Sequence, residues 1–174
     1  MPNALRIVTL CVVAAIVYGI TLDQVTVRVC LEYFTIGHPK LFQTESPTLL
    51  ALGWGVVATW WVGLLLGIPL AIAARRGNLP ARTADSLVRP IARLLAIMAI
   101  AAFVAAVIGF ALARADLVFL VEPMASDVPK DRHDPFIANL WGHTASYLVG
   151  FVGGAVLVRR VWKSRRETSA AIEE

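Results

Sequence analysis

Charged residues are scarce in this chain of 174 residues: only 16% are Asp, Glu, Lys or Arg, whereas 58% are hydrophobic. Four stretches, residues 7–22, 46–74, 94–113 and 135–158, contain no charged residue at all. A soluble domain carries about a quarter charged residues, spread over its length. The pattern therefore excludes a soluble enzyme and a disordered tail, and it predicts an all-α integral membrane protein.

Cysteines and short catalytic motifs are also nearly absent. Cys11 lies in the first apolar stretch and Cys30 lies after it, so the two thiols are expected at different depths and not as a disulfide. The chain lacks a glycine loop ending in Gly-Lys-Ser/Thr, an HExxH or CxxC motif, and paired carboxylates inside its apolar stretches. These absences disfavour phosphate binding, a standard zinc site and a proton-driven transporter.

The apolar stretches predict a single domain, a four-helix transmembrane bundle. We expect spans at about residues 5–22, 47–74, 94–113 and 136–158, outer loops at 23–46 and 114–135, and an inner loop at 75–93. The first span has the length of a signal peptide, but Tyr18-Gly19 makes a poor cleavage site, so an uncleaved anchor is favoured over a removed signal. The second span is long enough that it must tilt, kink near Pro69 or protrude.

The loops differ in their charge. Loop 75–93 has five arginines and one aspartate, and tail 159–174 has five basic and three acidic residues. Loop 114–135 is acidic on balance. By the positive-inside rule, both termini and loop 75–93 are expected in the cytoplasm of a bacterial cell, with the chain in the inner membrane. The basic residues therefore predict contact with anionic lipid headgroups and no nucleic-acid partner.

The first outer loop is expected to be structured. Residues 24–29 read Gln-Val-Thr-Val-Arg-Val, and such alternation with β-branched residues is typical of a short strand. A small strand pair is therefore possible in this loop. Gly37 and Pro39 flank His38 and predict a turn at that histidine.

Small residues recur every fourth position in the spans, which allows helix backbones to approach closely. The pattern predicts tight packing and no particular chemistry. The pairs on which it rests are Gly63 and Gly67, Ala105 and Gly109, and Gly150 and Gly154.

His143 is the main candidate for a functional residue, because a polar, ionisable side chain within a span is costly unless it has a use. One interpretation is structural: a neutral His143 hydrogen-bonds to a residue such as Ser146 or to a neighbouring helix. The other is a small site below the outer surface. His38, His133 and His143, with Glu32 or Asp134, have side chains that suit a divalent metal ion such as zinc, iron or copper.

Two functions remain open from the residues. The first is a non-enzymatic structural, assembly or regulatory component of a membrane complex, with no cofactor and with other subunits or a second copy as its partner. The second is a membrane-embedded protein that binds a metal or small ligand around His143, His38, Glu32 and His133, with catalysis as an option. Transport through this bundle alone is disfavoured because no polar path crosses the spans.

Two segments resemble a family of bacterial multi-pass inner-membrane proteins that has no known function. The first is Asp-Gln-Val-Thr-Val-Arg-Val-Cys-Leu-Glu-Tyr-Phe-Thr-Ile-Gly-His-Pro, residues 23–39, and the second covers residues 139–148. The resemblance covers about a fifth of the chain. It implies a bacterial cytoplasmic membrane location and brings no substrate, cofactor or catalytic residue with it.

Overall fold

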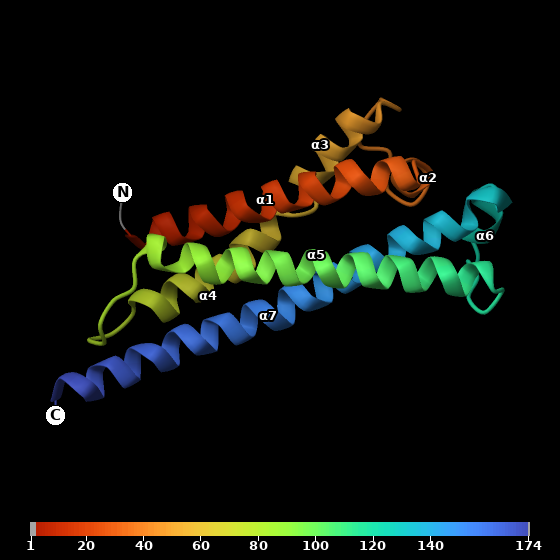
Figure 1. Ribbon diagram of the computed structural model, residues 1–174. Helices are drawn as coiled ribbons and strands as arrows, with labels where there is room; N and C mark the ends of the chain where they lie inside the picture. Colours follow the sequence, from red (N-terminus) through yellow and green to blue (C-terminus); the bar gives the residue numbers. More distant parts are fainter. Residues whose placement is uncertain (1–2, 174) are drawn as a thin grey trace.

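The protein is a bundle of long helices, seen in a computed structural model that describes the backbone of residues 3–173 and the side chains of residues 3–169 (Figure 1). Four helical segments are long and apolar enough to cross a membrane, as the apolar stretches predicted. The helices are α1 (Asn3–Val29), α2 (Glu32–Thr35), α3 (Pro47–Val57), α4 (Trp60–Arg75), α5 (Ala84–Arg114), α6 (Met124–Asp127) and α7 (His133–Glu173), with a short 3-10 turn at Lys130–Arg132.

The helices pack as two layers of neighbours. Helices α5 and α7 lie against each other over most of their length, and α1 lies against α3 and α4. Figure 1 shows both ends of the described chain at one end of the bundle, together with the α4–α5 connection, while α2 and α6 lie at the other end. Both termini and loop 75–93 are therefore on the same side, as the charge pattern requires.

The predicted strand at residues 24–29 is wrong, and no strand occurs in residues 3–173. Helix α1 continues through this segment to Val29. The buried residues Asp23, Thr26, Val27 and Cys30 recur at the spacing of one helix face, although the β-branched residues alternate. The helix therefore extends seven residues beyond the predicted end of the first span, and Asp23 is part of it.

The second span is divided into two helices at Ala58 and Thr59. Pro47 is the first residue of α3, which agrees with the predicted start of the second span, whereas α4 runs through Pro69 without a break. The hydroxyl of Thr59 donates to the carbonyl of Gly55 one turn earlier, a bond that is known to bend helices. The interruption therefore lies about ten residues closer to the outer end than Pro69.

The other two spanning helices are longer than predicted. Helix α5 begins at Ala84, where the Thr83 hydroxyl accepts a bond from the Ser86 N–H, so the inner loop is shorter than residues 75–93. Helix α7 runs from His133 to Glu173, so it continues well beyond residue 158, where the fourth span was predicted to end.

Glycines sit where helices cross closely. A side chain at Gly63 would collide with the α1 backbone at Val12, and one at Gly67 would meet Cys11. Gly109 is covered by Trp141, Gly150 faces Met98, and Gly154 faces Leu66, whereas Ala105 is half-buried on α5. The small residues thus allow contacts that larger side chains would block.

Arg165 fixes the end of the bundle at which α4 and α5 connect. The sequence predicted that the basic residues contact lipid headgroups, but this arginine is fully buried. Its guanidinium donates to four backbone carbonyls at the end of α4 and in the following turn, those of Ala73, Arg76, Leu79 and Pro80. Helix ends leave carbonyls without partners, so Arg165 supplies the donors that the α4 terminus lacks.

Candidate functional site

A cavity of about 130 Å³ runs between α1, α4, α5 and α7. Along α1 its lining extends from Cys11 to Asp23, about 18 Å of helix. The cavity is partly open at the surface of the bundle, so a bound molecule can extend beyond the enclosed volume. Since it is long for its volume, the cavity is narrow, and it fits an extended chain better than a globular molecule.

The two ends of the cavity differ in chemistry. Toward the end where α4 and α5 connect, the lining is apolar and includes Cys11, Leu66, Leu70, Ile91, Leu95 and Leu157. Toward the end that carries α2, ionisable and aromatic side chains replace them, and these include Asp23, Tyr33, His38, Trp54 and His143. Such a gradient suits a molecule with an apolar body and one polar end.

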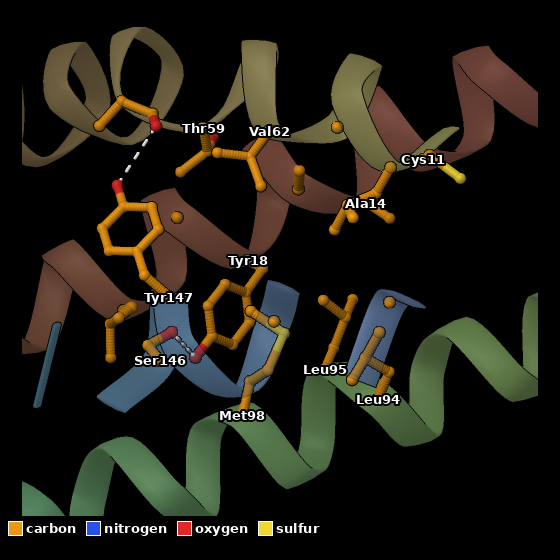
Figure 2. A pocket seen from close by; sticks show the side chains of 18 of the residues that line it. Cys11, Ala14, Tyr18, Thr59, Val62, Leu94, Leu95, Met98, Ser146 and Tyr147 are labelled. Atoms are coloured by element: carbon orange, nitrogen blue, oxygen red, sulfur yellow. Dashed lines mark hydrogen bonds between the residues drawn. The ribbon is translucent and has the colours of Figure 1, made fainter. Parts of the chain in front are cut away.

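Two tyrosines cross the middle of the cavity region (Figure 2). The hydroxyl of Tyr18 on α1 lies 2.7 Å from that of Ser146 on α7. The hydroxyl of Tyr147 donates to the carbonyl of Ala58, at 3.2 Å, where the break in the second span leaves that carbonyl accessible. The break between α3 and α4 therefore positions a polar contact for α7.

His143 faces α1 and not the lipid. Its side chain is 13% exposed, and its ring stacks on that of Tyr33 at 5.0 Å between centroids. Its Nε2 lies 3.2 Å from the Thr26 hydroxyl oxygen. Because the Thr26 hydroxyl donates its proton to the Leu22 carbonyl, it accepts from Nε2, so Nε2 carries a hydrogen. The structure thus supports the interhelical hydrogen bond that the sequence offered as one interpretation.

Asp23 is the residue that the sequence reasoning missed. It was assigned to the end of the first span, but its side chain is only 6% exposed and lies 3.7 Å from Nε2 of His143. Its carboxylate lines the cavity. The signal was present in the sequence, because Asp23, Thr26, Val27 and Cys30 have helical spacing, but the alternating valines favoured a strand.

Asn139 fastens α7 to the same part of α1. Its side-chain amide donates to the carbonyls of Thr26 and Cys30, at 2.8 and 3.3 Å. Asn139 is 2% exposed, so these bonds are protected from water. They hold His143, one turn further along α7, beside Thr26 and Asp23.

His38 belongs to an aromatic cluster next to His143. Its Nδ1 donates to the Tyr33 carbonyl at 2.7 Å, and its ring lies 4.9 Å from that of Tyr33 and 4.5 Å from that of Trp54. Burial lowers the pKa of His38, although the bond to Tyr33 opposes this effect. Burial, with Tyr147 and Asp23 nearby, raises the pKa of Tyr33. Both rings are therefore neutral at neutral pH.

The other predicted site residues lie elsewhere. His133 is bound through Nε2 to the Val128 carbonyl, and Asp134 pairs with Arg114 at 3.5 Å. Glu32 pairs with Arg132 at 3.0 Å. The structure brings only His38 and His143 together, both around Tyr33. Within the described part of the chain, no three His, Cys, Asp or Glu residues are grouped as metal ligands would be.

Cys30 and Glu32 form a separate contact beside α2. The Cys30 thiol donates to the Glu32 carboxylate at 3.3 Å, and burial raises the pKa of Cys30 to about 11, so the thiol keeps its proton. Burial acts to raise the pKa of Glu32, but bonds from its own backbone N–H, Arg132 and Cys30 lower it overall. This group links α1 to the turn before α7.

No protein-family model, curated protein or solved structure matches this chain. The functional argument therefore rests on the cavity and on the residues that line it.

Proposed function

We propose that the protein is a membrane-embedded binding protein whose interhelical cavity takes a small amphipathic ligand. The polar part of the ligand would lie at Asp23, Tyr33 and His143, and its apolar part would extend toward Cys11 and Leu70. The observation that carries this proposal is the single cavity lining that is polar at one end and apolar at the other. The proposal keeps His143 and His38 from the predicted small-ligand site and adds Asp23.

We further propose that the chain lies in a bacterial inner membrane with both termini in the cytoplasm. The placement of the termini and the α4–α5 connection at one end of the bundle supports this, because these segments carry most of the arginines. The polar end of the cavity would then lie in the outer leaflet, where an amphipathic ligand keeps its polar group near water.

The role of an assembly or regulatory component stays a prediction. Helix α5 exposes large apolar side chains such as Ile100, Phe103 and Val107, but lipid covers such a face as well as a partner does. No surface in the described part of the chain distinguishes a second copy or another subunit from lipid. The divalent metal ion likewise stays a prediction.

Equilibrium binding of tritiated decan-1-ol to the protein in nanodiscs tests the proposal, with empty nanodiscs as the blank. We expect saturable binding of about one molecule per chain. Ala14→Phe places a ring in the cavity and should abolish this binding, whereas Val13→Phe, on the lipid-exposed face of the same helix, should retain it. Binding that is equal in the two variants would contradict the proposal, provided that both show the parent's helix content and melting temperature.

A further inference from the structure

Among the side chains that the structure describes, none donates a hydrogen bond to the carboxylate of Asp23. The carboxylate lies 3.7 Å from Nε2 of His143. The hydrogen on that nitrogen is directed to the Thr26 hydroxyl, at the shorter distance of 3.2 Å. Asp23 thus ends in the cavity with a side chain that is more than nine-tenths buried and a partner that is engaged elsewhere.

No lysine or arginine in the described part of the chain lies in the cavity beside this carboxylate, because none of the lining residues is of either type. Arg28, five residues further along α1, bonds to Gln24 and Thr48. Arg132 bonds to Glu32. A buried carboxylate is costly unless a cation or strong donors accompany it. The missing partner is therefore a group that the ligand can bring.

Aromatic rings surround the same end of the cavity. Tyr33, Phe34 and Trp54 contribute to the lining there, and Tyr18 and Tyr147 follow in the middle of the cavity. The faces of such rings attract organic cations, and aromatic cages are the usual recognition device for ammonium groups. A hard metal cation, by contrast, needs six or so oxygen ligands, and this end of the cavity has only one carboxylate.

We infer that the ligand is a lipophilic amine with a single positive charge, whose ammonium group pairs with Asp23 among the aromatic rings and whose alkyl chain fills the apolar end of the cavity. This inference rests on the proposed function. The lack of a lining Lys or Arg distinguishes a simple amine from a zwitterionic lipid, because nothing there would neutralise a phosphate. The alkyl chain of the ligand gains little free energy on moving from lipid to the cavity, so the head group determines selectivity.

Three probes with the same tail test this inference in nanodiscs: decylammonium, decan-1-ol and decylphosphocholine. After subtraction of empty-nanodisc partitioning, we expect decylammonium to bind at least about tenfold more tightly than the alcohol, and the zwitterion to bind more weakly than either. Asp23→Asn keeps the shape of the side chain and should remove the preference for the amine. Asp134→Asn, a carboxyl outside the cavity, should leave it unchanged.

The outcomes separate the inference from the proposed function. The inference of an amine ligand is overturned if all three probes bind saturably with equal affinity. It is also overturned if the preference for the amine survives in Asp23→Asn. In both cases the cavity remains a binding site. Preferential binding of decylphosphocholine would also overturn the inference. No saturable binding of any probe would overturn the proposed function itself. If Asp23→Asn does not fold, competition between decylammonium and decan-1-ol on the parent protein decides the point.

Discussion

Asp23 on α1 and His143 on α7 lie 3.7 Å apart in the interior of the bundle, at the polar end of the cavity. Each of these side chains is expensive to bury in an apolar membrane protein. The Asn139 bonds to the α1 backbone hold them side by side, and Tyr33 stacks on the imidazole. The arrangement places an ionisable pair in the lining of the cavity, where a ligand can reach it.

The Asp23 carboxylate should weaken the empty protein. We expect Asp23→Asn to raise the free energy of unfolding in detergent by about 1 kcal/mol, because the amide avoids burial of a charge and can donate to its neighbours. A thermal melt of the parent and the variant without ligand checks this. Asp134→Asn, which loses only an exposed pair, should change stability by less than about 0.5 kcal/mol. A loss of stability in Asp23→Asn would show instead that the carboxylate is already paired.

His143 should contribute modestly to the packing of α7 on α1. His143→Leu removes the bond to Thr26 and the stacking on Tyr33, and we expect a loss of about 0.6 to 2 kcal/mol. A detergent melt measures the loss. Thr144→Val is the matched control on the next residue, because its hydroxyl bonds only to the Leu140 carbonyl of its own helix. No difference between the two variants would remove the structural role of His143.

Arg165 should be far more important than the other arginines of the tail. Arg165→Met leaves the carbonyls of Ala73, Arg76, Leu79 and Pro80 without their donors, and the expected loss is about 3 kcal/mol or more. Arg166→Met, on the exposed face one residue later, should cost less than about 0.5 kcal/mol. Chemical denaturation in mixed micelles compares the two. Equal losses of stability in the two variants would contradict this role of Arg165.

His38 should make the outer end of the protein acid-sensitive. Burial lowers its pKa in the folded protein, so the unfolded chain binds a proton more readily as the pH falls. The contribution of neutral His38 is therefore complete above its ordinary pKa of about 6.5 and is lost progressively as the pH falls below that value. Melting temperatures of the parent between pH 8 and pH 5 should fall more steeply than those of His38→Gln. If the melting temperatures of the parent and of His38→Gln depend on pH in the same way, His38 is not the cause of the acid sensitivity.

Much of the fold could be predicted from the sequence because lipid imposes strict rules. Uncharged stretches long enough to cross a bilayer predicted four spanning helices and the start of the second at about residue 47. The segment at residues 24–29 was misread because β-branched residues are compatible with both strand and helix. Tertiary contacts decided the outcome, since Thr26 bonds to Asn139 and His143 of α7 and Val27 is buried beside it.

The site was less predictable because its parts are distant in sequence. His143 stood out as an ionisable residue inside a span, and a hydrogen bond to a neighbouring helix was one of its two interpretations. Asp23 did not stand out, because an acidic residue at a span's expected end is ordinary. The burial of Arg165 depends on where the α4–α5 turn folds back, and a cluster of five basic residues does not show which one turns inward.

The most direct test of the central claim is to locate a bound ligand chain. A decylamine with a diazirine at the far end of its chain can be irradiated with the protein in nanodiscs, and the labelled residues can be mapped by mass spectrometry. The cavity predicts labelling at Cys11, Leu70 or Leu157 that decylammonium competes away and that Ala14→Phe abolishes. Labelling that is confined to lipid-exposed residues such as Phe103 and that resists competition would contradict the claim.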